Sequence, residues 1–238
     1  FFSHKMDVTT LLVVAAIIAI AALFLLRPKK KGKSVLLVGL PNTGKTCFWM
    51  QMMTGEFPGT HTSMKENIGE IPSNLTPSKF KGKKIPLVDL PGHSRLRPLL
   101  DQKLTEARAI IFFIDSLDFT QTISSCAELL YTLLTDSKLV EQGTPMMMAC
   151  NKRDLDFSYK LVTIKNKLES ELNIVRKSKQ NEIYSLGETD SVSKVVPLGV
   201  EGQPFSFDSQ SPLPLYWCEC SVKENNVSEL TNWLWAIF

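Results

Sequence analysis

The sequence predicts an α/β fold in which a mainly parallel sheet is covered by helices on both faces, preceded by one N-terminal transmembrane helix. Two observations lead to this prediction. From Val8 to Leu26 the chain holds nineteen residues without a charge, a proline or a glycine. From residue 34 onward, short apolar runs rich in β-forming residues alternate with helical patterns. Strands that are apolar on both faces and joined by helices are typical of parallel sheets with both faces covered.

The apolar run has the length of a membrane span. A helix over residues 8–26 would cover about 28 Å, close to the hydrocarbon thickness of a bilayer. A secretory signal peptide has a shorter apolar region and a small-residue cleavage site, whereas this run ends in FLLRP. Five basic residues follow in 27–33, and the positive-inside rule then places the remaining chain in the cytosol. We therefore expect a lumenal stub 1–7, a basic juxtamembrane linker 27–33 against the lipid bilayer, and a cytosolic domain 34–238.

Charge and cysteine content restrict what this domain binds. Six of the 27 Lys and Arg residues lie in residues 1–34, with one of the 24 acidic residues, so the remaining chain has a net charge of −2. A mildly acidic body does not favour nucleic-acid binding through a broad basic face. The five cysteines lie in apolar surroundings and are predicted to be reduced, buried thiols. The chain begins with Phe1 rather than Met, so we expect further residues before it.

The domain is predicted to contain five strands and five helices. The expected strands are Ser34–Val38, Ile85–Asp89, Ala109–Asp115, Met146–Asn151 and Leu215–Cys220. The expected helices are Lys45–Thr54, Leu96–Glu106, Thr120–Leu134, Tyr159–Val175 and Ser228–Ile237. Segment 176–214 combines Ser, Gly, Pro and mixed charge with little periodicity, which predicts a flexible insert.

A phosphate-binding loop follows the first expected strand. The stretch GLPNTGKT fits G-x-x-x-x-G-K-[ST] between a strand and a helix, which is the context that this motif requires. Its backbone N–H groups form an anion-binding nest at a helix N-terminus, the Lys45 ammonium reaches the β- and γ-phosphates, and the Thr46 hydroxyl is a Mg²⁺ ligand. The predicted nucleotide-binding residues here are Gly39, Leu40, Pro41, Asn42, Thr43, Gly44, Lys45, Thr46 and Cys47.

The next motif, DLPGH, stands at the carboxyl end of an expected strand, where ligands gather in open α/β sheets. Asp89 is predicted to hold Mg²⁺ through water, and the Gly92 N–H to bond a γ-phosphate and so to sense its presence. His93 is a candidate catalytic residue, because a ring nitrogen can hydrogen-bond an attacking water. The alternative is that His93 only begins the next helix.

The sequence NKRD predicts which base is bound. The two carboxylate oxygens of Asp154 match the paired N1–H and N2–H₂ donors of guanine, whereas adenine presents an acceptor at N1. The stem of Lys152 can lie over the base plane, and Asn151 can connect this loop to the phosphate loop. After the last expected strand, a backbone N–H in the stretch that contains Ser221 and Val222 can reach the guanine O6.

A polar stretch between the first two motifs is a candidate mobile switch. Thr60 and Thr62 both qualify as the residue that caps Mg²⁺ and the γ-phosphate, and Thr62 is favoured. Ser63 is expected to contribute to the same nucleotide site.

These stretches, in this order, resemble the Ras-like GTPases. The resemblance implies a P-loop GTPase domain over residues 34–238 that binds GTP or GDP with Mg²⁺. Within this superfamily, DLPGH, the membrane run, THTS, the insert and the ECSVK strand end are most similar to the beta-subunit family of the signal recognition particle receptor. Val222 departs from the family's usual Ala, with little expected effect because that contact comes from the backbone.

That family resemblance implies a partner and a location. The chain is expected to bind the N-terminal domain of the receptor's alpha subunit in a GTP-dependent way at the endoplasmic reticulum membrane. It would act indirectly with the signal recognition particle, the ribosome and the translocon. Slow GTP hydrolysis is expected. Two alternatives stay open: a vesicle-trafficking GTPase of the Arf/Sar kind, and a GTP-bound structural tether that does not hydrolyse its nucleotide.

Overall fold

The computed structural model describes residues 32–57, 65–80, 82–93, 97–186 and 196–238. The predicted transmembrane helix 8–26 and the switch residues Thr60, Thr62 and Ser63 lie outside these ranges. Within the described ranges, no helix combines the length and the apolar character that crossing a bilayer requires.

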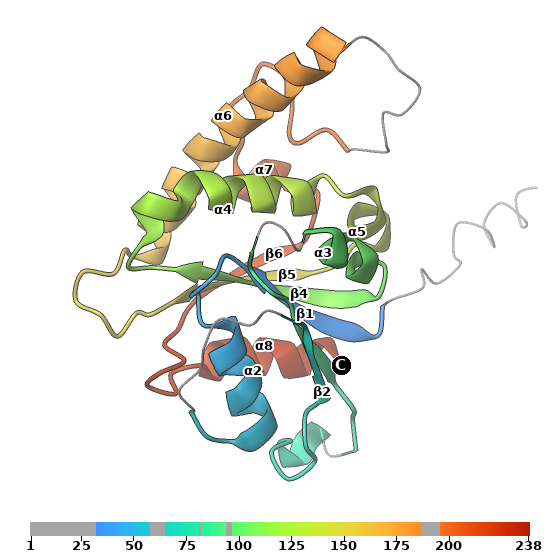
Figure 1. The fold of residues 1–238 in the computed structure, drawn as a ribbon, viewed down its shortest axis with the longest axis vertical. Coiled ribbons are helices and arrows are strands. Elements are labelled where there is room, and N and C mark those ends of the chain that lie inside the picture. Colours follow the sequence, from blue (N-terminus) through green and yellow to red (C-terminus); the bar gives the residue numbers. More distant parts are fainter. Residues whose placement is uncertain (1–31, 58–64, 81, 94–96, 187–195) are drawn as a thin grey trace, which may run out of the picture. The chain divides into compact units, whose positions relative to one another are not determined.

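The described residues form a mixed six-stranded sheet in the order β2-β3-β1-β4-β5-β6 (Figure 1). All neighbours pair in parallel except β2, which is antiparallel to β3 at one edge. The strands are β1 Ser34–Gly39, β2 Asn67–Glu70, β3 Pro86–Asp89, β4 Ala107–Asp115, β5 Met146–Asn151 and β6 Leu215–Glu219. The prediction of a mainly parallel sheet is therefore confirmed.

Helices cover both faces of this sheet (Figure 1). Apolar residues of α3, α4, α5, α6 and α7 pack on one face, and those of α2 and α8 pack on the other. The helices are α2 Lys45–Thr54, η1 Ser78–Phe80, α3 Arg97–Leu104, α4 Phe119–Leu134, α5 Ser137–Gln142, α6 Leu161–Leu186, α7 Phe207–Gln210 and α8 Ser228–Ile237.

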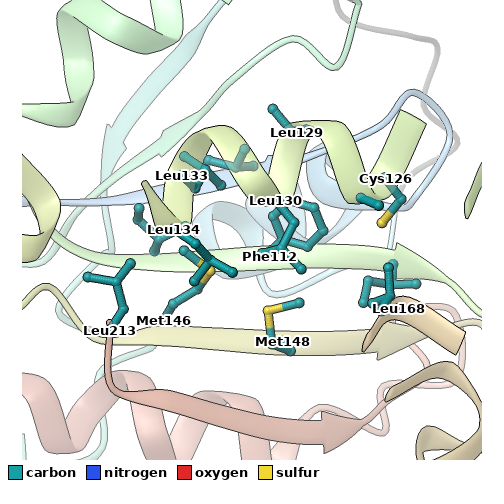
Figure 2. Packing of buried hydrophobic residues seen from close by; sticks show 14 of the residues in the cluster. Phe112, Cys126, Leu129, Leu130, Leu133, Leu134, Met146, Met148, Leu168 and Leu213 are labelled. Atoms are coloured by element: carbon teal, nitrogen blue, oxygen red, sulfur yellow. The ribbon is translucent and has the colours of Figure 1, made fainter. Parts of the chain in front are cut away.

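The central strands are buried on both faces, as their continuous apolar sequences predict. Along β4, Ile110 and Phe112 belong to the core under α4, while Ile111 and Phe113 belong to the core under α2 and α8. Figure 2 shows the first of these cores, in which Leu130 and other apolar residues of α4 face Phe112 of β4 and Met146 and Met148 of β5. Burial of this kind orders the strand ends from which the loops emerge.

Strand β2 and helices α5 and α7 are absent from the prediction. Strand β2 contains Ile68, which is 58% exposed, and no other large apolar residue. Pairing with β3, rather than any apolar periodicity of its own, therefore makes it a strand. Helix α5 begins at the N-cap Asp136, whose side chain accepts a hydrogen bond from Leu139 N, and ends at Gly143.

Of the predicted flexible insert 176–214, residues 187–195 lie outside the described ranges, and the described parts include the end of α6 and all of α7. Helix α6 continues through residue 186, and Leu198, Phe205 and Phe207 of the returning chain are buried in the core. The guanidinium of Arg176 is buried and donates to the carbonyl oxygens of Leu198, Val200 and Gln203. These bonds attach the returning chain to α6, which low periodicity alone does not reveal.

The prediction of reduced, buried thiols is confirmed for four of the five cysteines. No disulfide joins any of the five cysteines, all of which lie in the described part of the chain. Four of them are buried, and Cys47 is partly exposed at the start of α2.

Candidate nucleotide-binding site

A cavity of about 320 Å³ lies where β1, β3, β5 and β6 end, at their carboxyl edge. This is the edge at which open α/β sheets bind ligands. The cavity is lined by Pro41, Asn42, Gly44, Lys45, Thr46, Cys47, Phe57, Leu90, Pro91, Gly92, Asn151, Lys152, Asp154, Leu155, Val222 and Lys223. The structure therefore brings the phosphate loop, the DLPGH motif, the NKRD motif and the last loop together, as predicted from their order.

Two glycines allow the loops to approach one another. Gly44 has a positive φ of 95°, and a Cβ added there would lie 2.2 Å from the side-chain nitrogen of Asn151. A Cβ at Gly92 would lie 2.5 Å from the carbonyl carbon of Leu40. Any larger residue at either position would push the phosphate loop away from a neighbouring motif.

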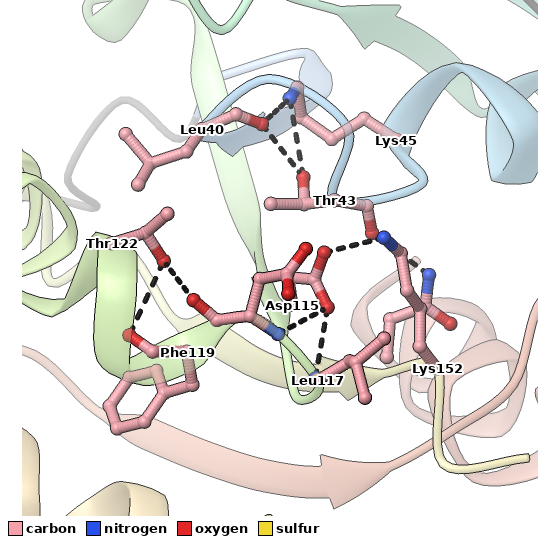
Figure 3. A network of polar contacts seen from close by, with 10 residues as sticks. Leu40, Thr43, Lys45, Asp115, Leu117, Phe119, Thr122 and Lys152 are labelled. Atoms are coloured by element: carbon pink, nitrogen blue, oxygen red, sulfur yellow. Dashed lines mark hydrogen bonds and ion pairs between the residues drawn. The ribbon is translucent and has the colours of Figure 1, made fainter. Parts of the chain in front are cut away.

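Lys45 is buried at the start of α2. Its ammonium donates to the carbonyl oxygen of Leu40 at 2.6 Å and to the Thr43 hydroxyl at 3.3 Å (Figure 3). Burial lowers the pKa of Lys45 to about 8, although the nearby carboxylate of Asp89 raises it. Both hydrogen-bond acceptors are neutral, so an anion in this cavity would bring the buried ammonium a charged hydrogen-bond acceptor.

The proposed Mg²⁺ ligands lie beside each other. The Thr46 hydroxyl donates to Asp89 Oδ2 at 2.8 Å, and Asp89 is fully buried. The side-chain amide of Asn67 donates to the same Oδ2 at 2.8 Å, from the position on β2 directly opposite Asp89. A hydroxyl and a carboxylate are the hard oxygen donors that Mg²⁺ prefers, so these residues fit that ion. Sequence reasoning missed Asn67, because nothing in the sequence indicates that β2 is a strand.

Asn151 connects the NKRD loop to the phosphate loop, as the sequence predicted. Its side-chain amide donates to the Thr43 carbonyl oxygen at 2.8 Å, and its Oδ1 accepts from Val222 N at 3.0 Å. One buried side chain therefore holds both the phosphate loop and the loop after β6.

Two further pairs support the residues that are predicted to read the base. The Ser221 hydroxyl donates to Asp154 Oδ1 at 2.7 Å, which orients a carboxylate on the cavity wall. The Lys152 ammonium pairs with Asp115 Oδ2 at 2.5 Å (Figure 3). Ser221 is buried and does not line the cavity, and the same is true of Thr43 and Asp89.

His93 lies beside this cavity, next to Gly92 of its lining. Its side chain is exposed and lines a second cavity together with residues of α3 and α4, such as Leu100 and Gln121. Gly39 and Leu40 also line this second cavity. The wall of the first cavity, as far as the described residues define it, does not include His93, and its catalytic role stays a prediction.

Three residues at the site belong to none of the predicted motifs. Phe57 and Leu155 line the cavity although no motif contains Phe57 and Leu155 only follows NKRD. Asp115 ends β4 without belonging to any of the motifs, and its partner Lys152 is 37 positions away. A polar residue at the end of a buried strand was the available indication for Asp115.

The sheet order, the phosphate loop before α2 and the loops that meet it define an α/β GTPase fold. The chain also matches the family model described as "Signal recognition particle receptor beta subunit" over residues 30–211. It therefore belongs to the signal recognition particle receptor beta-subunit family, as the sequence motifs indicated.

Individual relatives agree with this assignment. The signal recognition particle receptor subunit beta of Mus musculus is 32% identical over 244 residues, which cover 97% of this chain and 88% of that protein. A structure of the mammalian SRP receptor is 33% identical, with a TM-score of 0.72, covering 86% of this chain and all of that chain. The SRb-GTP/SRX complex from Chaetomium thermophilum shares the fold at 19% identity, with a TM-score of 0.67 over 85% of this chain and 99% of that one.

Proposed function

We propose that this protein is a membrane-anchored GTP-binding subunit that holds the alpha subunit of the signal recognition particle receptor at the endoplasmic reticulum membrane. The observation that carries the nucleotide part is the cavity on which Lys45 and Asp154 both lie, with Asn151 hydrogen-bonded to the loops on both sides. The proposed phosphate site and the proposed base site therefore lie side by side at the carboxyl edge of the sheet.

The chemistry of the cavity favours guanine nucleotides. Lys45 and the N-terminus of α2 attract the phosphates, while Thr46 and Asp89 would hold Mg²⁺, which neutralises phosphate charge. The Asp154 carboxylate accepts from the N1–H and N2–H₂ of guanine and repels the N1 acceptor of adenine. GTP and GDP with Mg²⁺ are therefore the proposed ligands.

The alpha subunit is the proposed partner. The Chaetomium structure contains a GTP-bound relative with SRX, which supports a partner that recognises the GTP form. We assign this role to the N-terminal domain of the alpha subunit, with the signal recognition particle, the ribosome and the translocon reached only through it. The apolar run 8–26 and the basic residues 27–33 would provide the anchor, with the GTPase domain in the cytosol.

A capture experiment tests this proposal. The full chain in detergent, immobilised and loaded with GTP, GDP or a non-hydrolysable GTP analogue, is exposed to the alpha subunit's N-terminal domain. We expect at least tenfold more capture by the GTP-loaded forms. Asp154→Ala, which removes base recognition, should abolish the difference, and equal capture by GDP-loaded protein would contradict the proposed switch.

Slow GTP hydrolysis is proposed to accompany binding, with His93 positioning the attacking water. His93 is exposed beside Gly92, so this role requires its side chain to turn towards the phosphate side. Single-turnover hydrolysis of His93→Ala, with and without the alpha-subunit domain, is the test. An unchanged rate would remove His93 from the mechanism and favour the non-hydrolysing tether.

The apolar run also separates this proposal from the Arf/Sar alternative. Those GTPases attach reversibly through an amphipathic helix or an acyl chain, whereas residues 8–26 have no polar face. We expect the protein to remain in membranes after extraction with alkaline carbonate. Its release would argue against the anchor while leaving nucleotide binding intact.

A further inference from the structure

Asp115 is a buried acidic residue that the proposed nucleotide chemistry does not use. It ends β4, and its side chain is 8% exposed, against 30% for the side chain of its partner Lys152. The Lys152 ammonium contacts Asp115 Oδ2 at 2.5 Å. Lys152 also lines the cavity, so its side chain extends from the cavity wall to a fixed carboxylate behind that wall.

The position of this carboxylate is fixed by the backbone. Asp115 Oδ1 accepts from Leu117 N at 3.0 Å and from Asp118 N at 3.4 Å, at the turn that leads into α4 (Figure 3). Oδ1 is therefore bonded to the backbone of the turn, and Oδ2 is bonded to the Lys152 ammonium. A carboxylate anchored in this way gives the lysine a partner with a defined place.

Lys152 needs such a partner. It adopts a positive φ of 67°, a conformation that L residues rarely take, and its long side chain has many rotamers to choose from. An ion pair at the end of the stem selects one of these conformations. The methylene groups can then form an apolar wall of the cavity while the charge is neutralised away from the ligand.

We infer that Asp115 is a positioning residue for base binding: through the ion pair it holds the Lys152 stem against the plane of the nucleotide base. This inference rests on the proposed guanine-nucleotide site. Because it concerns the base and not the phosphates, Asp115 should contribute equally to the retention of GDP and of GTP.

Asp115→Asn tests the inference, since Asn keeps an oxygen for the turn and loses the charge. Release of fluorescent GDP and GTP analogues from the full-length chain is measured by stopped flow. We expect release to accelerate on the order of tenfold, by the same factor for both nucleotides. Asp118→Asn is the matched control, because Asp118 is exposed and its side chain caps no helix N–H, and it should leave release unchanged.

A double-mutant cycle with Lys152→Met shows whether Asp115 acts through Lys152. Methionine retains an apolar stem without the charge, so Asp115→Asn should accelerate release no further in that background. Equal acceleration in both backgrounds would overturn the inference and assign the effect to the turn before α4. So would acceleration confined to GTP, or none in the wild-type background.

Two additional measurements separate a folding defect, and a failure of the proposed function, from a failure of the role of Asp115. If Asp115→Asn does not fold, Asp115→Glu moves the carboxylate by one methylene and should again accelerate release only when Lys152 is present. Failure of the wild-type chain to bind any guanine nucleotide would reject the proposed function itself. Binding by the wild type with an unaffected Asp115→Asn variant would reject only the role of Asp115.

Discussion

The phosphate side of the cavity is centred on one continuous stretch of chain, the phosphate loop, whereas the base side is assembled from the ends of β4, β5 and β6. On the phosphate side, Leu40, Thr43 and Lys45 contact one another within five residues of sequence. On the base side, Asp115 forms an ion pair with Lys152, and Ser221 donates a hydrogen bond to Asp154, which lies 67 positions away in sequence.

The two sides obtain their order in different ways. Backbone geometry and a helix N-terminus organise the phosphate side locally, so its central cation can be buried at a cost to stability. Side chains that hold one another organise the base side, so each member supports both stability and binding. Substitutions should therefore separate binding from stability on the phosphate side and couple them on the base side.

The largest effect is expected for Lys45→Met. Nucleotide affinity should fall at least a hundredfold, because charge-assisted hydrogen bonds to the phosphates are lost, at about 1.5–3 kcal/mol each. The stability of the ligand-free protein should hold or increase, since methionine removes a buried ammonium. Titration with a fluorescent GDP analogue and thermal unfolding measure the two effects. A large loss of stability in the ligand-free variant would contradict the proposal that binding and stability are separate on the phosphate side.

Asn151→Ala should change both quantities, because this residue joins the two sides. Its removal leaves the Thr43 carbonyl and the Val222 N–H without their buried partner, at about 2–3 kcal/mol in the free energy of unfolding. Affinity for GDP should fall roughly thirtyfold. Urea unfolding and nucleotide titration are the measurements. Asn166→Ala, at an exposed position of α6, is the control and should change neither.

The pH dependence of binding isolates the phosphate side. Phosphate contacts favour the charged form of Lys45, whose pKa in the ligand-free fold is about 8, so affinity should fall about tenfold from pH 7 to pH 9. The sign is opposite for ligand-free stability. The unfolded chain, with the ordinary lysine value of 10.5, binds more protons between pH 8 and 10.5, so this group makes stability rise across that window.

Lys45→Arg provides the control, since a guanidinium stays charged throughout this range. Its affinity for GDP, although lower, should be flat from pH 7 to pH 9. An equal decline in the arginine variant would assign the pH dependence to another group.

The same contrast explains what the sequence could predict. Helix α2 was predicted with its observed bounds, because the phosphate loop marks its start and Gly55, at φ 81°, marks its end. The phosphate-loop motif lies within eight consecutive residues, so a short sequence pattern is enough to predict both the loop and the start of the helix. The pairing of Asp115 with Lys152 depends on the adjacency of β4 and β5, which no short pattern contains.

Elements without an apolar period were also missed. The part of α6 beyond Val175 is mostly polar in sequence, and its only available indication was the lack of Gly and Pro from Leu161 to Leu186. Strand β2 depends on β3 for its hydrogen bonds, so its register and the contact between Asn67 and Asp89 follow only from the assembled sheet.

The smallest effect is expected for Asn67→Ala, which tests whether this non-local contact extends the phosphate side. Asn67 and Thr46 both donate to Asp89 Oδ2, so loss of Asn67 should loosen the carboxylate and weaken Mg²⁺ binding about three- to tenfold. The measurement is GDP release against Mg²⁺ concentration: the midpoint should shift upward, while release in excess chelator stays unchanged because the phosphate loop is intact. Glu70→Gln, at the far end of β2 in an exposed ion pair with Lys84, is the matched control. If release in chelator accelerated as much as release in Mg²⁺, Asn67 would support the sheet edge rather than the metal site, and the phosphate side would be as local as its sequence motif.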